Sequence, residues 1–362
     1  MSRLVWVRSA VVLVAFLSHG PSVRAEHRGP TFAVIMTNDA VSNQIQVYDT
    51  STKVLVQTLS TNGQGGAGGN ARGVKQYKGE IVAAVNWGSN TVAVYTREGD
   101  RLKFDKLVTT TSAPLSVDFG NDHMYVAGAT TVDSFALQGN HVAWRDGTAP
   151  LELAGGGLPP NGSTAQVGVM DSRHVLVTLK DPPDRGSVDV IALDNGAVTG
   201  AVPTAVAAPE NTFTPFGFSV YPDGTAVVTL AHTSEAGLFR NGAFTAITAV
   251  GQTADCWTTR VGKYVFTANT GSKTISRLIG TGNNVFVDSS VAASIATGGA
   301  PADIDTDAGV LGVIDHGAGQ SHLSLFTYNE FGELVASGAP ITLGVANANG
   351  VAVMSPPDVD ER

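Results

Sequence analysis

Residues 264–277 read YVFTANTGSKTISR, and this stretch predicts the basic unit of the fold. Its two halves alternate apolar and polar residues, which is typical of β-strands, and a cluster of Asn, Gly and Ser separates them as a turn. Residues 34–49 (VIMTNDAVSNQIQVYD) and 83–95 (AAVNWGSNTVAVY) repeat the pattern. We therefore expect a β-hairpin that recurs along the chain.

A second element precedes each hairpin and recurs at intervals of roughly 46 residues, the length of one four-stranded propeller blade. We interpret each copy as the innermost strand of a blade, where small residues relieve crowding around a narrow axis. The copies start at Asn70, Ala113, Thr164, Thr214, Asp255, Ala300 and Asn347.

The two ends of the repeat region predict how the ring closes. Residues 31–60 supply three strands of one blade without an inner strand, and a last inner strand near residues 349–354 follows every other element. We predict that this strand completes the first blade, because an unpaired edge would otherwise remain. The predicted fold is all-β, a seven-bladed β-propeller of four-stranded antiparallel blades. A long β-sandwich is the alternative, which the regular period disfavours.

The composition restricts the partners. The formal net charge is −9 and 15% of the residues are charged. Nucleic acids and anionic membranes attract clustered Lys and Arg, so we expect neither as a partner. We expect a monomer that binds a small molecule. The single cysteine, Cys256, cannot form an intramolecular disulfide, and we interpret it as a small buried apolar residue.

Residues 1–25 have the layout of a secretory signal, with arginines before a short apolar run and small residues at the end. The apolar run, residues 10–17, is shorter than the roughly 20 residues that span a bilayer. We predict cleavage before Glu26, a secreted or periplasmic location, and a single propeller domain over residues 26–362.

Several segments resemble the lactonase-like seven-bladed propellers with YVTN-type repeats. They are residues 86–92 (NWGSNTV), 215–218 (PFGF), 255–257 (DCW) and 264–276. This family groups 6-phosphogluconolactonases with carboxymuconate-cyclising enzymes, and the resemblance covers residues 31–357. It implies the propeller fold, hydrolase-type chemistry on a lactone, and an acid/base group with arginines at the mouth of the channel.

Ligands of propellers bind where the inner strands begin and the hairpin loops converge. The residue before each small inner-strand position is expected to face this mouth. These residues include Arg72, Gln166, Phe216, Trp257 and Asn349. Two polar loops, residues 231–235 (AHTSE) and 315–322 (DHGAGQSH), are expected beside them.

Opening a lactone needs a general base and a donor for the developing oxyanion. We predict His232 as the base, because the unperturbed pKa of histidine lies near neutral, and Glu235 as the group that orients it. Arg72 or Arg260 could bind a carboxylate through a planar guanidinium, and Trp257 could form an apolar wall. The alternative for His232 and Glu235 is an exposed turn with a surface ion pair.

Two functions remain open at this stage. One is a lactonase-like enzyme that hydrolyses or forms a lactone of a small carboxylated compound. The other is a non-catalytic propeller that binds a protein, a glycan or a small ligand, because one fold hosts many functions. We predict no cofactor. We also predict no metal, since the loop at residues 315–322 lacks a regular spacing of three or four ligands.

Overall fold

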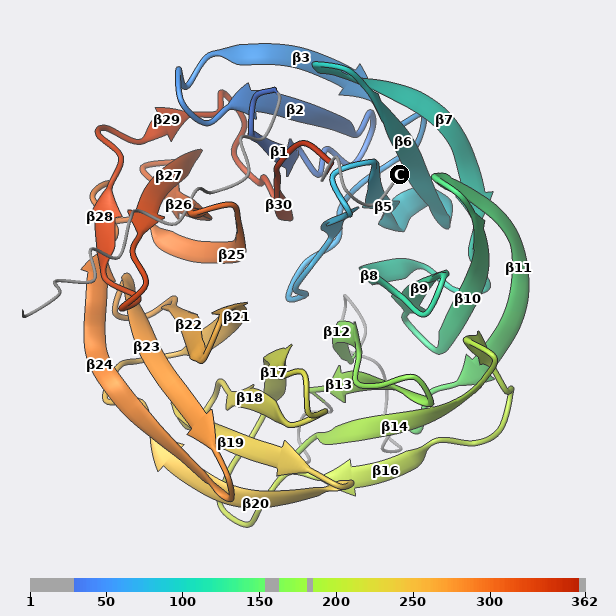
Figure 1. Ribbon diagram of the computed structural model, residues 1–362, viewed down its shortest axis with the longest axis vertical. Helices are drawn as coiled ribbons and strands as arrows, with labels where there is room; N and C mark the ends of the chain where they lie inside the picture. The colour runs from blue at the N-terminus through green and yellow to red at the C-terminus, as the bar shows by residue number, and fades with distance from the viewer. Residues whose placement is uncertain (1–28, 154–162, 181–184, 358–362) are drawn as a thin grey trace, which may run out of the picture.

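The computed structural model describes residues 29–153, 163–180 and 185–357, which form a ring of seven sheets around a central axis (Figure 1). Apart from one 3₁₀ turn, η1 (Trp87–Ser89), the described residues form strands and loops. The predicted seven-bladed β-propeller is therefore confirmed. No helix in the described ranges is long and apolar enough to cross a membrane. The expected leader, residues 1–25, lies outside the described residues.

Every blade has the same strand order from the axis to the rim. The innermost strands are β30 (Val351–Met354), β4 (Val74–Tyr77), β8 (Pro114–Gly120), β12 (Thr164–Val169), β17 (Pro215–Val220), β21 (Asp255–Val261) and β25 (Ala300–Asp307). The second strands are β1 (Phe32–Met36), β5 (Ile81–Asn86), β9 (His123–Gly128), β13 (His174–Leu179), β18 (Ala226–Leu230), β22 (Tyr264–Asn269) and β26 (Val310–Gly317).

The two outer layers complete the blades. The third strands are β2 (Gln44–Asp49), β6 (Thr91–Glu98), β10 (Thr131–Gln138), β14 (Ser187–Asp194), β19 (Glu235–Arg240), β23 (Thr274–Thr281) and β27 (Gln320–Tyr328). The outer strands are β3 (Leu55–Ser60), β7 (Arg101–Thr109), β11 (His141–Pro150), β16 (Thr204–Ala207), β20 (Ala243–Ala249), β24 (Asn284–Ser294) and the pair β28 (Leu334–Ala336) and β29 (Ile341–Thr342), while β15 (Ala197–Val198) also pairs with β14.

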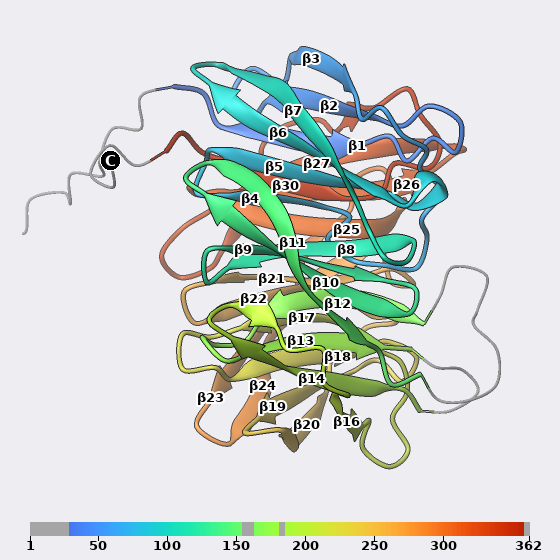
Figure 2. The same cartoon turned by 90° about the vertical axis from the view of Figure 1, so that its right-hand side faces the viewer.

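Blade 1 joins the two ends of the described chain. Its strands β1, β2 and β3 come from the N-terminal part, and β30 pairs antiparallel with β1, so that Val351 lies opposite Ile35 and Met354 opposite Phe32. Blades 2 to 7 follow in chain order. Figure 2 shows that both ends of the described chain lie on one face of the ring. The predicted closure by the last inner strand is confirmed.

The apolar core lies between the blades. Each blade packs against a neighbour on both faces, so second strands such as β5 and β9 are buried at every position. The outer strand β20 alternates between exposed and half-buried residues, because only one of its faces meets another blade. Burial of strands on both faces explains why small and β-branched residues fill the second layer.

The inner strands have no strand partner on the axial side. Side chains of neighbouring blades form hydrogen bonds with some of the backbone groups on that edge. A row of three aspartates on β25 accepts backbone N–H groups in and just after β30. Asp303 accepts from Val351 at 3.2 Å, Asp305 from Val353 at 3.0 Å and Asp307 from Ser355 at 2.8 Å. Burial raises the pKa of Asp303 to about 7. These bonds attach blade 7 to the strand that closes the ring.

Two of the predicted inner strands begin four residues later than expected. The strand β4 starts at Val74 instead of Asn70, and β30 starts at Val351 instead of Asn347. Arg72 has φ of 56° and Gly350 has φ of 92°, and these left-handed conformations are incompatible with an extended strand. The residues before both strands therefore turn toward the axis, where they become part of the site.

Truncation after Gly344 would remove β30 and expose the edge of β1. We expect the truncated protein to aggregate or to lose cooperative thermal unfolding, because the row of β25 carboxylates also loses its N–H partners. Size-exclusion chromatography and calorimetry would measure this. A truncation after Pro357 keeps β30 and is the control. A monomer with an unchanged melting temperature after the first truncation would contradict the closure.

Candidate functional site

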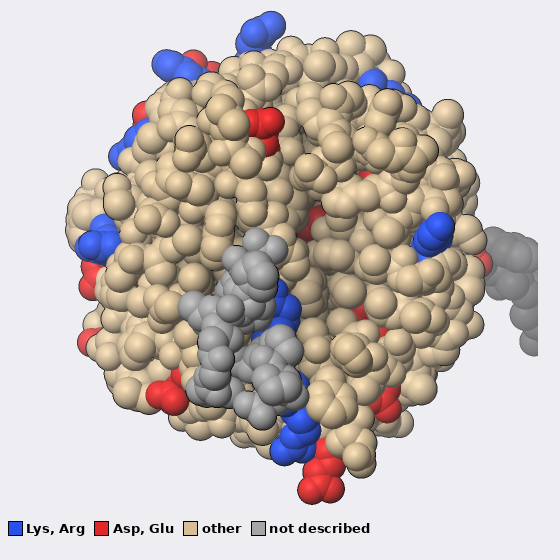
Figure 3. Space-filling view, turned by 180° about the vertical axis from the view of Figure 1, so that it is seen from behind, with Lys and Arg blue, Asp and Glu red and all other residues tan. Residues whose placement is uncertain are grey.

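Two cavities lie along the ring axis, one toward each end. The larger has a volume of about 990 Å³ and the smaller about 260 Å³. Three inner strands, β17, β21 and β25, line both: β21 contributes Trp257 to the larger cavity and Arg260 to the smaller, and β17 contributes Phe216 and Ser219 in the same way. Figure 3 shows the face opposite the described chain ends, which is hollowed near the axis and carries its charged side chains mainly toward the periphery.

Residues 66–73, here called the axial segment, run into the middle of the ring ahead of β4 (Figure 1). Hydrogen bonds attach this segment to blades 3, 4 and 6. Asn70 Nδ2 donates to Leu115 O at 2.6 Å, Ala71 N donates to Ala165 O at 2.8 Å, and Trp257 Nε1 donates to Asn70 O at 2.9 Å. Asn70 lines the larger cavity and Arg72 the smaller one. The segment thus lies between the two cavities.

The glycine-rich stretch at residues 63–69 joins blades 1 and 2. Position 65 requires glycine because the backbone of Asn38 lies close to it, and an added Cβ would be 2.5 Å from that backbone. Glycine is required by conformation at Gly69, where φ is 61°. The stretch can therefore pass close to blade 1 and enter the axis.

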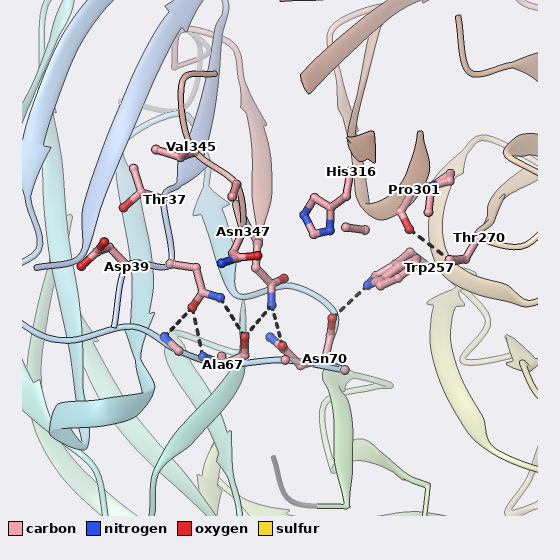
Figure 4. A pocket seen from close by; sticks show the side chains of 18 of the residues that line it. Thr37, Asp39, Ala67, Asn70, Trp257, Thr270, Pro301, His316, Val345 and Asn347 are labelled. Carbon is pink, nitrogen blue, oxygen red and sulfur yellow. Dashed lines mark hydrogen bonds between the residues drawn. The ribbon is translucent and has the colours of Figure 1, made fainter. Parts of the chain in front are cut away.

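Asparagine side chains hold the axial segment in place (Figure 4). The amide of Asn38 donates to Ala67 O at 2.7 Å and accepts from the N–H groups of Gly66 and Ala67 at 2.9 and 3.0 Å. Asn349 Nδ2 donates to Asn70 Oδ1 at 2.8 Å. These amides are buried, and only Oδ1 of Asn349 lacks a hydrogen-bond partner among the described residues, so this part of the cavity wall is fixed before any ligand binds.

Aromatic side chains form the opposite wall. Trp257 and Phe216 pack edge to face, with ring centroids 5.4 Å apart and an interplanar angle of 79°. Trp257 also reaches the axial segment through its indole N–H (Figure 4). Cys256 lies beside it, and burial raises the pKa of its thiol to about 12, so the sulfur stays protonated. This wall offers an apolar surface to a ring-shaped ligand.

His316 supplies an acid/base group at the cavity wall. Its Nε2 lies 2.8 Å from Ala348 O, and a carbonyl oxygen only accepts hydrogen bonds. The neutral imidazole therefore carries its proton on Nε2, and Nδ1, which makes no hydrogen bond among the described residues, keeps its lone pair. In Figure 4 the imidazole lies between the labelled Asn347 and Trp257.

Asn347 and Asp39 also line this cavity. The exposed Asn347 side chain makes no hydrogen bond within the described part of the chain, so its amide is available to a ligand. Asp39 accepts the backbone N–H groups of Ser42 and Val41 at 2.7 and 2.8 Å, and these bonds lower the pKa of its carboxyl group. Asp39 is therefore an anion at neutral pH.

The residues predicted from the sequence are divided among several places. Phe216, Trp257 and Asn349 line the larger cavity, and Arg72 and Arg260 line the smaller one. The structure therefore brings together the two arginines proposed as carboxylate ligands, but at the other end of the axis from the aromatic wall.

The other three predicted residues line neither cavity. Gln166 is buried and bridges to the backbone of Phe218, donating at 2.7 Å and accepting at 3.1 Å. His232 is exposed on blade 5 with its ring 6.2 Å from that of Phe213, and Glu235 is the first residue of β19. A role of His232 and Glu235 in catalysis remains a prediction.

Asn38, Asn70 and Asn347 belong to the cavity but were not selected from the sequence. Two of them, Asn70 and Asn347, are the first residues of inner-strand copies, so the repeat alignment contained a signal for them. The selection used the residue just before the small position instead. That rule places Phe216, Trp257 and Asn349 in the larger cavity. It fails for Gln166 of blade 4, which lines neither cavity, and for Arg72 of blade 2, which lines the smaller one.

No family model and no curated protein matches the sequence. Solved structures do match. A putative 6-phosphogluconolactonase from Bacteroides fragilis has a TM-score of 0.63 at 11% identity, covering 90% of this chain and 98% of that chain. Periplasmic gluconolactonase PpgL from Pseudomonas aeruginosa has a TM-score of 0.62 at 13% identity, covering 90% and 99%. Virginiamycin B lyase from Staphylococcus aureus has a TM-score of 0.54 at 14% identity, covering 78% and 92%.

The chain has the fold of the lactonase-type propellers. This agrees with the resemblance inferred from the repeats, and at such identities the likeness concerns the fold. The activity has to be argued from the cavities of this chain.

One buried acid lies directly behind the wall of the larger cavity. Asp255 precedes Cys256 on β21, is fully buried, and has no hydrogen-bond partner for either carboxyl oxygen among the described residues. Burial, with a smaller contribution from Glu235, raises the pKa of Asp255 well above its ordinary value. Its cross-strand neighbour Asn269 also has an unpartnered Oδ1, to which a protonated carboxyl could donate.

Replacing Asp255 by Asn should make stability less dependent on pH. Because the native pKa exceeds the unfolded one, the folded protein binds an extra proton, and its stability falls as pH rises from about 4 toward the native pKa. Asp255→Asn lacks this loss, so its melting temperature relative to the parent should increase with pH. Asp39→Asn is the control with the opposite sign, since the pKa of Asp39 is lowered. Parallel melting curves of parent and Asp255→Asn across pH would contradict the assignment.

Proposed function

We propose that the chain is a lactonase-type hydrolase that opens a small lactone in the larger cavity, with His316 as the general base. The observation that carries the proposal is the bond from Nε2 of His316 to Ala348 O, which leaves Nδ1 unprotonated at the cavity wall. A base of this kind can activate water near neutral pH.

The reaction follows from the groups available. Nδ1 of His316 takes a proton from water, and the water oxygen bonds to the lactone carbonyl carbon. The amide of Asn347 donates to the developing oxyanion. The ring C–O bond then breaks, and the leaving alkoxide takes the proton back from His316. The products are the carboxylic acid and the new hydroxyl group, which account for the lactone and one water molecule.

The lining favours a neutral, hydroxylated substrate. Among the described residues of the larger cavity there is no Lys or Arg, and Asp39 is negative. The ammonium of Lys180 borders the cavity, but it donates to Gly69 O and lies 5.8 Å from the ring centroid of Phe216. The carboxylated substrate expected from the sequence would have to compete with these contacts. The hydroxyls of Thr37 and Thr270 and the amide of Asn347 can bond to hydroxyl groups, while the face of Trp257 can pack on a sugar-like ring.

The structural neighbours support this proposal in two ways. One neighbour is named a periplasmic gluconolactonase. Another is a catalytically inactive variant of virginiamycin B lyase in which a histidine is replaced by alanine, in a structure with quinupristin. A histidine on a propeller of this kind can therefore be essential to an enzyme.

Substitution of His316 tests the proposal. With gluconolactone as the probe, His316→Ala should lower kcat/KM by roughly 10²–10⁴-fold, the usual contribution of a general base. His232→Ala is the matched control, because His232 is an exposed histidine that lines neither cavity, and its turnover should equal that of the parent. Acid release in a pH-stat, corrected for spontaneous hydrolysis, measures both.

Two results would contradict this assignment. Loss of turnover in His232→Ala with full activity in His316→Ala would restore the base predicted from the sequence. No turnover in the parent on gluconolactone and other neutral lactones, with saturable ligand binding that is lost in Trp257→Ala, would identify a binding module instead.

We also propose that the protein is exported. The signal-like residues 1–25 and the periplasmic neighbour support this location. Mass spectrometry of the protein isolated from its host should find an N-terminus near Glu26. An intact N-terminal Met1 on a cytosolic protein would contradict export.

A further inference from the structure

The smaller cavity has a different chemistry from the larger one. Its lining residues come from the inner-strand region of blades 2 to 7, so the cavity lies on the ring axis, below the axial segment. They are Arg72, Lys75, Asp118, Phe119, Val169, Ser219, Val220, Thr259, Arg260, Asp305 and Thr306. Because the residues from blades 3 to 7 lie toward the ends of their inner strands, the cavity faces the side of the ring that carries the described chain ends. Three cationic side chains meet two carboxylates there.

Each of the two carboxylates already pairs with a cationic side chain and accepts a backbone N–H group from another blade. Asp118 lies 3.3 Å from Arg72, and its Oδ2 also accepts the N–H of Val169 on the next blade at 3.0 Å. Asp305 has the same double role: Oδ1 accepts from Lys75 at 3.1 Å, and Oδ2 accepts from Val353 at 3.0 Å. Since each carboxylate ties two blades together, neither is free to neutralise a third cation.

Arg260 is that third cation. Its Nη1 donates to Gly262 O at 2.7 Å, and its guanidinium lies 5.7 Å from the ring centroid of Tyr221. Within the described ranges no carboxylate lies within ion-pair distance of Arg260, and its side chain is half-buried. A guanidinium has five N–H donors, so most of those on Arg260 remain unused by the protein.

We propose that the smaller cavity is a binding site for a small oxyanion, either a carboxylate or a phosphate group. Arg260 is the primary ligand, and the remaining donors of Arg72 and Lys75 complete the site. Guanidinium groups pair with planar carboxylates and with phosphates through two parallel hydrogen bonds. The cavity volume of about 260 Å³ accommodates a phosphate ion or a short-chain carboxylic acid.

This site is independent of the proposed lactone site. The axial segment lies between the two cavities, with Asn70 on one side and Arg72 on the other. The inference therefore holds whether or not the larger cavity is catalytic. It gives the two arginines selected from the sequence as carboxylate ligands a role at the end of the axis away from the aromatic wall.

Calorimetric titration of the full chain with inorganic phosphate, and separately with succinate, tests the proposal. At least one probe should bind saturably, and which one binds tells phosphate from carboxylate chemistry. Arg260→Gln should weaken binding at least tenfold, and Arg260→Lys, which keeps the charge, should retain part of the affinity. Affinity should also fall as the salt concentration rises, because salt screens the charges.

Arg240→Gln is the matched control, since Arg240 is an arginine of the third strand of blade 5 that bonds to Gly282 and Asn283 outside the cavity. Its affinity for the probe should equal that of the parent. Melting curves of all variants verify that the ring is folded. The proposal is overturned if neither probe binds saturably to the parent, or if folded Arg260→Gln binds as tightly as Arg240→Gln.

Discussion

The architecture depends on one constraint at the axis of the ring. Each of the seven inner strands is the last strand of its sheet, so the backbone N–H and C=O groups on its axial edge have no neighbouring strand to bond with. Buried N–H and C=O groups without partners are costly, so the edge has to be satisfied by other means. In this protein side chains of neighbouring blades do much of this. The aspartates of β25 accept N–H groups in and next to β30, and Gln166 bridges to Phe218. The same bonds that satisfy the edge also hold the blades together.

The axial segment also provides hydrogen-bond partners for the inner strands. Residues 66–73 bring backbone and amide groups into the centre, where they bond to Leu115, Ala165 and Trp257. A channel that would otherwise run through the ring is thereby divided into two cavities with different lining. One is walled by amides and aromatic rings, and the other by arginine, lysine and aspartate. The chemistry of each cavity depends on which part of the inner strands lines it. Residues near the starts of β17, β21 and β25 line the larger cavity, and residues near their ends line the smaller one.

Burial also creates acids with unusual protonation. The carboxyl groups of Asp303 and Asp255 are fully removed from water, and burial raises the pKa of both. They differ in their partners. Asp303 accepts two backbone N–H groups, whereas neither oxygen of Asp255 has a partner among the described residues. Asp255 is therefore the one whose replacement by an amide should reduce the dependence of stability on pH.

The repeat pattern was enough to predict the blade, the number of blades and the closure of the ring. Strand alternation and the repeat of one supersecondary unit are local patterns that can be recognised without knowledge of tertiary contacts. The sequence also placed Trp257, Phe216 and Asn349 at the mouth, since inner strands of a regular ring present equivalent positions to the same end. The tertiary structure alone decided which polar residues share a cavity. The left-handed backbone conformation at Arg72 places its side chain in the smaller cavity. The contact between Nε2 of His316 and Ala348 O leaves Nδ1 of His316 as the candidate base, and the repeat pattern gives no sign of this contact. Both arrangements bring together segments that are distant in the sequence and meet only in the folded ring.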